Sequence, residues 1–308
     1  MTGRDVAVAR APAKFNAHLA VGPLRADGFH ELRTVYLAVS LLDTVTVRPG
    51  EGLSVSVSGE GADGADAVPT DRRNLVWRAA ELLAAHAGVP ADARIEIAKA
   101  IPAAAGLAGG SADAAAALVA LDALWGTGAS RADLTGLAAQ LGSDVPFSLA
   151  GGVALGTGRG EQLSPVLART RWHWVLGIAG GGLSTPAVYR ELDRLRAAGR
   201  VPDGADLASA EPVIGALRTG PAAALGSALY NDLQAPAVAL RPELGRALRT
   251  ATDAGAAGVL VSGSGPTVAA LAADEQDAVR LTAELAGAGV FRTVRAVHGP
   301  VPGARLVG

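Results

Sequence analysis

The chain has 308 residues, enough for two domains that each bury a core and leave a cleft between them. It has no cysteine, which excludes disulfides, thiolate nucleophiles and cysteine-bound metals, and its net charge of −2 with scattered basic residues disfavours nucleic acid as a partner. No apolar stretch suits a membrane span and no secretory leader is evident, so we expect a soluble, cytoplasmic protein with no membrane partner.

The first predicted element is an extended segment over residues 6–21. Its alternation predicts a polar face with Lys14, Asn16 and His18, opposite an apolar face with Phe15, Ala17, Leu19 and Val21. After a turn at 25–28, β-branched sequence from 32 to 47 predicts a second strand with a break near residues 42–43. The chain is therefore expected to start as an antiparallel sheet.

A small-residue loop at residues 102–110 follows a predicted strand at 94–97 and opens a predicted helix at 111–125. Small side chains let a polyanion approach the backbone, and the N–H groups at a helix start favour negative charge. The loop lacks the Lys-Ser or Lys-Thr of a P-loop and the spacing of a dinucleotide fingerprint. It indicates phosphate binding, and the alternative is a tight loop that packs the helix onto the sheet.

The helices on either side of this loop have clear end signals. Asn74 is the expected N-cap of a helix that ends at Gly88, and Ser130 with Asp133 predicts a capping box for a helix that stops at Gly142.

A composition shift after the glycine-rich residues 151–160 places the domain boundary at residue 160. The expected domains are residues 1–160 and 161–308. In the second, strands at 175–178 and 259–261 and helices at 186–198 and 243–254 suggest an α+β sandwich, with residues 202–224 as a loose connection.

Lysine usage singles out two positions. All but two of the 27 basic residues are Arg, and the exceptions are Lys14 and Lys99. An exposed lysine can drift to arginine at little cost, whereas a site that needs a compact ammonium cannot accept a planar guanidinium. Both lysines are therefore candidates for function, against the alternative of accidental surface positions.

Three separated segments resemble, in order, the motifs of the GHMP kinase superfamily: residues 11–16, residues 102–111 and residues 262–267. The resemblance implies a two-domain α+β fold, with a strand-rich N-terminal ATP-binding domain and an α/β sandwich as the C-terminal substrate domain. It also implies a kinase that transfers a phosphoryl group from ATP to an alcohol with Mg²⁺, whose ligands the motifs do not specify.

Residues 25–32 and 141–147 narrow the resemblance to a branch that phosphorylates the 2-hydroxyl of a diphosphocytidyl methylerythritol in non-mevalonate isoprene biosynthesis. The implied partner is a small molecule with a cytidyl diphosphate group. Another GHMP kinase, of homoserine or mevalonate type, and a non-catalytic nucleotide-binding regulator of the same fold remain alternatives. His30 with its aromatic neighbour suits a pyrimidine, which disfavours the first, and intact Lys14 and Asp144 disfavour the second.

Carried over residue by residue, the resemblance implies that Lys14 and Asp144 are catalytic. It implies substrate contacts from Asn16, Phe29, His30, Asp144, Thr185 and Tyr189. It implies nucleotide contacts from Asn74, Leu75, Lys99, Pro102, Ala104, Ala105, Gly106, Leu107, Gly109, Gly110 and Ser111.

Simpler interpretations stay open for several of these residues. Asp144 could cap a short helix, Lys14 could be an exposed strand lysine, and Phe29 and Tyr189 could be packed core residues. Phe29 stands where the family usually has tyrosine. Ala104 and Ala108 replace common loop glycines, and their methyl groups leave less room around phosphates.

Overall fold

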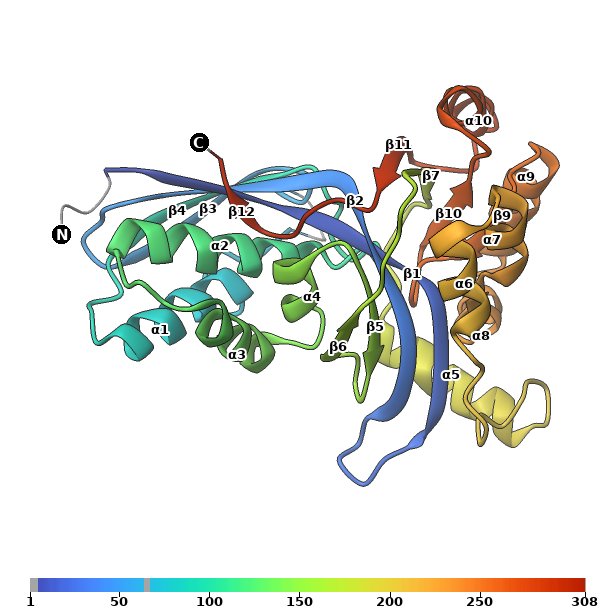
Figure 1. The fold of residues 1–308 in the computed structure, drawn as a ribbon, viewed down its shortest axis with the longest axis horizontal. Coiled ribbons are helices and arrows are strands. Elements are labelled where there is room, and N and C mark those ends of the chain that lie inside the picture. The colour runs from blue at the N-terminus through green and yellow to red at the C-terminus, as the bar shows by residue number, and fades with distance from the viewer. Residues whose placement is uncertain (1–4, 64–66, 308) are drawn as a thin grey trace.

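The computed structural model, which describes residues 5–63 and 67–307, contains two sheets that lie end to end with helices packed against each (Figure 1). No helix in these residues combines the length and the apolar composition that crossing a membrane requires.

Within the described residues, the first sheet has eight strands. Its main order is β12-β1-β2-β4-β3, with β5 paired to β2, β6 paired to β5 and β8 paired to β1. Its strands are β1 (Ala7–Leu24), β2 (His30–Arg48), β3 (Leu53–Gly59), β4 (Ala93–Lys99), β5 (Val153–Thr157), β6 (Gln162–Pro165), β8 (Tyr230–Asn231) and β12 (Arg305–Leu306). Its helices are α1 (Leu75–Ala87), α2 (Gly109–Trp125), α3 (Arg131–Leu141) and α4 (Val145–Ala150).

The predicted helix ends of this half are confirmed. Asn74 caps α1 by accepting a hydrogen bond from the N–H of Val76, and Gly88 ends the helix in the left-handed conformation. The capping box of Ser130 and Asp133 opens α3. Local side-chain chemistry thus fixes the helices that flank α2.

In the part of the chain that the structure describes, the second sheet has four strands in the order β11-β7-β10-β9. They are β7 (Trp172–Ile178), β9 (Gly258–Val261), β10 (Thr267–Leu271) and β11 (Thr293–Gly299). The helices of this half are α5 (Thr185–Ala197), α6 (Glu211–Thr219), α7 (Ala222–Ala228), α8 (Gln234–Leu240), α9 (Pro242–Asp253) and α10 (Glu275–Gly287).

The loose connection predicted at residues 202–224 is wrong where α6 and the start of α7 occupy it. Val213 and Leu217 are one helical turn apart, and both are fully buried in a hydrophobic core that also includes Trp174 and Leu260 of the second sheet. Their burial, together with that of Leu225, stabilises short helices in a stretch rich in Ala, Gly and Pro.

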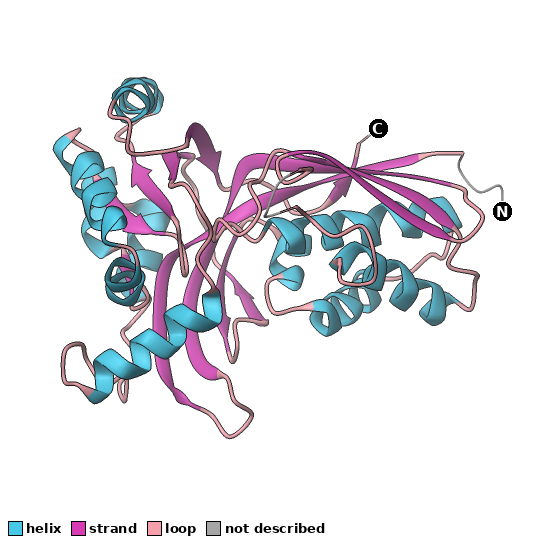
Figure 2. Cartoon of the chain, turned by 180° about the vertical axis from the view of Figure 1, so that it is seen from behind, coloured by secondary structure: helices cyan, strands magenta, loops and turns pink. Residues whose placement is uncertain are grey.

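Strands β1 and β2 form one long ribbon that runs through both halves and bends between them (Figure 2). The break predicted near residues 42–43 is a bulge, since Pro12 pairs with Leu42 whereas Ala13 pairs with Val39, and β2 continues through it.

A second bulge in the ribbon changes which face of β1 is buried. Asn16 pairs with Tyr36 and His18 with Val35, so Ala17 is an extra residue and the alternation reverses there. Lys14 and Asn16 keep one face, but the prediction that His18 shares it is wrong. His18 instead lies buried beside the backbone carbonyl of Ala208, and Leu19 and Val21 join the second core.

Several connections cross the boundary expected at residue 160. The hairpin of β5 and β6 lies on both sides of it, and β12 returns from the second half to pair with β1. The division at residue 160 therefore stays a prediction.

Candidate active site

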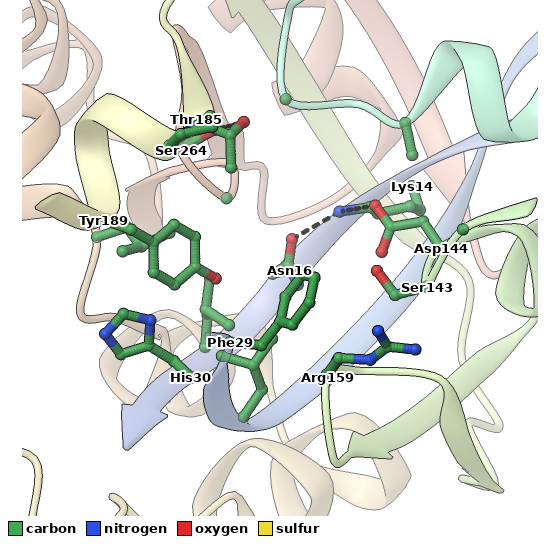
Figure 3. A pocket seen from close by; sticks show the side chains of 18 of the residues that line it. Lys14, Asn16, Phe29, His30, Ser143, Asp144, Arg159, Thr185, Tyr189 and Ser264 are labelled. Atoms are coloured by element: carbon green, nitrogen blue, oxygen red, sulfur yellow. Dashed lines mark hydrogen bonds and ion pairs between the residues drawn. The ribbon is translucent and has the colours of Figure 1, made fainter. Parts of the chain in front are cut away.

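A cleft of about 990 Å³ opens beside the bend of the ribbon and is lined from both halves (Figure 3). Lys14 and Asn16 of β1 line its middle, and the loop before α2 lines one wall. The tip of the β1–β2 hairpin and helix α5 close the other end. Segments far apart in sequence thus meet around one space.

Lys14 and Asp144 converge in this cleft, as expected from the sequence. The Nζ of Lys14 lies 3.2 Å from a carboxylate oxygen of Asp144. Asp144 occupies the N-cap position of α4, but its side chain makes no capping hydrogen bond there. Lys14 is 6% exposed, so it is not a surface strand lysine. Both simpler interpretations fail in the structure.

A chain of hydrogen bonds holds the ammonium in place. Lys14 Nζ donates to Asn16 Oδ1 at 3.0 Å, and Asn16 Nδ2 donates to Thr34 Oγ1 at 2.6 Å. Lys14 also lies over the ring of Tyr36, with Nζ 5.3 Å from the ring centroid. The Lys14 side chain is thereby fixed toward the carboxylate before any ligand binds.

Two phenols near Asp144 stay uncharged. Burial and then the charge of Asp144 raise the pKa of both Tyr36 and Tyr189 above the usual value for tyrosine. The carboxylate of Asp144 is therefore surrounded by an ammonium and neutral hydroxyls, and a carboxylate in such a place can accept a proton from a hydroxyl group.

The small-residue loop presents backbone to the cleft. Ala104, Ala105, Gly106, Gly109 and Gly110 line it, and α2 starts without any side-chain cap on its first N–H groups. Those uncapped N–H groups and the helix dipole suit an anion.

The loop is also held by other segments. The N–H of Lys14 donates to the carbonyl of Leu107 at 3.1 Å, and the hydroxyl of Ser262 donates to the carbonyl of Gly106 at 2.9 Å. A Cβ on Gly106 would lie 2.5 Å from the carbonyl oxygen of Ser262, so this position requires glycine. The loop and the Ser262–Pro266 segment therefore meet as backbone against backbone.

Both alanines that replace family glycines have left-handed backbone. Ala104 has φ 50° and Ala108 has φ 57°, a region that costs an L residue about 1–2 kcal/mol. The substitutions thus leave the loop's left-handed geometry in place at the cost of strain.

Not every residue expected at the nucleotide lines the cleft. Within the described chain, the lining does not include Asn74, Leu75, Lys99, Pro102, Leu107 or Ser111. Asn74 is occupied as a helix cap, and Leu107 is buried. Direct contacts from these residues remain predictions.

Lys99 belongs instead to a buried ionic cluster with Asp43 and Asp113, which we name the Lys99 cluster. Its Nζ lies 2.6 Å from Asp43 and 2.7 Å from Asp113, and the Lys99 side chain is 1% exposed. The other oxygen of Asp43 accepts from the N–H groups of Ala100 and Ile101, at the entry to the loop. The cluster therefore anchors the entry to the loop, and Lys99 is not among the residues that line the cleft.

The Lys99 cluster places two acidic side chains against one ammonium. Burial opposes the charge of Lys99, but Asp113 and then Asp43 outweigh it and raise its pKa. Burial raises the pKa of Asp113 to about 8, against the attraction of Lys99. One oxygen of Asp113 is buried without a hydrogen-bond partner in the described chain.

Aromatic residues gather at the other end of the cleft (Figure 3). Phe29 is 51% exposed at the hairpin tip, which is unlike a core residue, and the guanidinium of Arg159 lies 4.8 Å from its ring centroid. His30 packs on Tyr189 with ring centroids 5.1 Å apart. The hydroxyl of Thr185 is hydrogen-bonded to that of Ser264 at 2.8 Å. All the residues expected at the substrate line this one space.

The lining also includes residues that were not singled out from the sequence, among them Ser143, Arg159, Asp193 and Ser264. Asp193 lies 2.9 Å from His30 Nε2 although it is far away in the chain. Ser143 and Ser264 lie within residues 141–147 and 262–267, which resemble family motifs, so their position in those motifs could have identified them from the sequence. For Arg159 and Asp193 no local signal exists, because their roles depend on tertiary contacts.

Family models match both halves of the chain. A model described as GHMP kinases N terminal domain matches residues 74–152, and one described as GHMP kinases C terminal matches residues 213–290.

Curated relatives extend the similarity over almost the whole length. A protein of Rhodococcus jostii (strain RHA1) named 4-diphosphocytidyl-2-C-methyl-D-erythritol kinase is 60% identical over 300 residues, which cover 97% of this chain and 94% of the relative. A protein of the same name from Mycobacterium tuberculosis (strain ATCC 25177 / H37Ra) is 56% identical, with 97% and 92% covered.

Solved structures agree with this similarity. The crystal structure of a 4-(cytidine 5'-diphospho)-2C-methyl-D-erythritol kinase matches with a TM-score of 0.74 at 34% identity, covering 97% of this chain and 99% of its own. A homoserine kinase from Cytophaga hutchinsonii ATCC 33406 matches with a TM-score of 0.76 at 20% identity, covering 100% and 99%, and shows the shared fold alone.

Proposed function

The chain belongs to the GHMP kinase family, and on that premise we propose that it transfers the γ-phosphoryl group of ATP to the 2-hydroxyl of 4-diphosphocytidyl-2-C-methyl-D-erythritol. Family membership confirms the predicted two-domain α+β fold and the prediction that the chain is a small-molecule kinase.

The convergence of Lys14 and Asp144, 3.2 Å apart in a cleft with distinct ends, is the observation that carries this proposal. In the proposed reaction the substrate hydroxyl oxygen forms a bond to the γ-phosphorus while the bond to the β–γ bridging oxygen breaks and ADP leaves. Asp144 accepts the hydroxyl proton, and Lys14 offsets negative charge on the transferred group.

The loop end of the cleft fits a nucleoside triphosphate. Uncapped N–H groups at the start of α2 can donate to phosphate oxygens, and small residues let the phosphates approach the backbone. We place ATP there, on residues 104–110.

We propose that Mg²⁺ enters with the nucleotide. Residues 5–63 and 67–307 contain no group of three or more His, Cys, Asp or Glu that could hold a metal alone. Mg²⁺ in kinases is held largely by phosphate oxygens and water with one or two carboxylates, and Asp144 is a carboxylate in reach of the cleft. When bound, the ion neutralises charge on the phosphates.

The aromatic end fits a cytosine base. Phe29 and Tyr189 offer ring faces for stacking, and His30, Asn16 and Thr185 offer polar groups along the same space. The substrate would then extend from the hairpin tip to Asp144, with the hydroxyl between the carboxylate and the loop. The division into an ATP-binding domain at 1–160 and a substrate domain at 161–308, a cytoplasmic location and the lack of a nucleic-acid partner remain predictions.

The test is ADP release by purified protein with ATP, Mg²⁺ and 4-diphosphocytidyl-2-C-methyl-D-erythritol, with Asp144→Asn as the matched inactive control. Substrate-dependent ADP release by the wild type alone supports the proposal. Equal or faster turnover of homoserine or mevalonate would assign another kinase activity. If the protein consumes no ATP with any of the three alcohols, the result favours the alternative of a non-catalytic nucleotide-binding regulator.

A further inference from the structure

We propose that Asp193 is a positioning residue that fixes the tautomer of His30 and thereby makes the cleft selective for cytosine over uracil. The inference rests on the proposed function, since it concerns how the base of that substrate is recognised.

The geometry around His30 fixes where its proton lies. Nε2 of His30 is 2.9 Å from Oδ1 of Asp193, and the His30 side chain is 6% exposed. An ionised carboxylate can only accept hydrogen bonds, so Nε2 carries the proton and donates. The hydrogen bond to Asp193 thus fixes the tautomer of the neutral His30 ring, with the proton on Nε2 and none on Nδ1.

The second ring nitrogen is left for a ligand. In residues 5–63 and 67–307, Nδ1 of His30 has no hydrogen-bond partner, and this atom is not fully buried. It therefore keeps contact with solvent, and His30 lines the cleft. Packing of the ring on Tyr189, with centroids 5.1 Å apart, limits its rotation. In the neutral ring Nδ1 is an acceptor with a fixed position.

A fixed acceptor distinguishes the two pyrimidines. Cytosine has an amino group at C4, which can donate to Nδ1, whereas uracil has a carbonyl oxygen there, which would face Nδ1 as a second acceptor. A matched donor and acceptor pair discriminates between bases by about 10- to 100-fold. Without Asp193 the proton can move to Nδ1, which then donates to the uracil oxygen, and the preference is lost.

The experiment compares the affinities of CDP and UDP by calorimetry, with the nucleotide end saturated by a non-hydrolysable ATP analogue and Mg²⁺. The variants are Asp193→Ala and, as matched control, Glu191→Ala, an acid of the same helix that pairs with Arg194. Thermal melting checks that both variants fold. A nitrogen-15 NMR spectrum of the wild-type histidine rings identifies the tautomer of His30 independently.

We expect the wild type and Glu191→Ala to prefer CDP by at least about tenfold, and Asp193→Ala to bind the two ligands within about threefold. Wild-type selectivity in a folded Asp193→Ala, or an Nδ1-protonated His30 in the wild type, overturns the inference and leaves the proposed function intact. Failure of the wild type to bind CDP, with ATP bound normally, contradicts the proposed function itself.

Discussion

Replacing Asp113 by Asn tests the charge state of the Lys99 cluster. Burial raises the pKa of Asp113 to about 8, whereas an aspartate in an unfolded chain titrates near about 3.9. Between these values the folded protein holds a proton that the unfolded chain releases. The perturbation removes that proton uptake but keeps the size of the side chain and an oxygen that can accept from Lys99.

The sign and size of the effect follow from proton linkage. Because the folded state binds more protons, the free energy of unfolding falls as pH rises, by at most about 1.4 kcal/mol per pH unit for one proton. The stabilisation is complete below about pH 4 and is lost as pH rises through about 8. Between pH 7 and 8, where Asp113 is partly titrated, the loss is about 1 kcal/mol.

Histidines do not obscure this window. Burial lowers the pKa of His18 and of His298, so their effect has the opposite sign and is complete near the ordinary histidine pKa, below pH 7.

The assay is urea unfolding at several pH values between about 7 and 8.5 for the wild type, Asp113→Asn and the exposed control Asp253→Asn. We expect the wild type and the control to lose stability with rising pH, and Asp113→Asn to show a flat profile. A wild-type slope in Asp113→Asn, or a flat profile in the wild type, would refute the reasoning.

Asp144→Asn is expected to lower turnover by about 10²- to 10⁴-fold while ATP affinity stays within about twofold, measured by ADP release and calorimetry; retention of most of the rate would contradict the assigned role. The double variant Ala104→Gly with Ala108→Gly should relieve about 1–2 kcal/mol of backbone strain at each site. Each glycine also adds entropy to the unfolded chain, which costs about 0.4–1 kcal/mol, so the free energy of unfolding measured in urea should rise by about 1–2 kcal/mol in total. The control Ala103→Gly, in the same loop but outside the left-handed region, should lose stability, and an equal response would sink the strain argument. Lys99→Met leaves the buried Asp43 and Asp113 without their cation and should cost about 3–5 kcal/mol. A loss under about 1 kcal/mol would contradict this expectation.

The sequence predicts best where the cause is local. Caps at Asn74 and Ser130 and the strand–loop–helix order around residues 102–110 depend on neighbouring residues, and the structure has them as expected. The scarcity of lysine marked Lys14 and Lys99, and both are buried with carboxylate partners, but only Lys14 faces the cleft. Composition can therefore show that an ammonium is needed without showing what for.

The sequence predicts worst where a distant contact decides. The bulge at Ala17 reverses the alternation of β1 and removes His18 from the polar face, yet nothing in the strand sequence marks it. Asp43 and Asp113 read as ordinary polar residues of a strand and a helix until the fold brings them onto Lys99. Asp193 similarly acquires its contact with His30 only when α5 packs beside the hairpin.

The β1–β2 ribbon also determines how this protein can be divided. Ala7 to Ala17 contribute to one core, and Leu19 and Val21 contribute to the other. A fragment made of residues 161–308 alone would lack those two side chains and expose apolar surface, and a fragment of residues 1–160 would lack the pairing of β12 with β1. Each piece would need the other during synthesis, so cleavage near residue 160 should leave an associated pair of polypeptides and not two separately stable proteins.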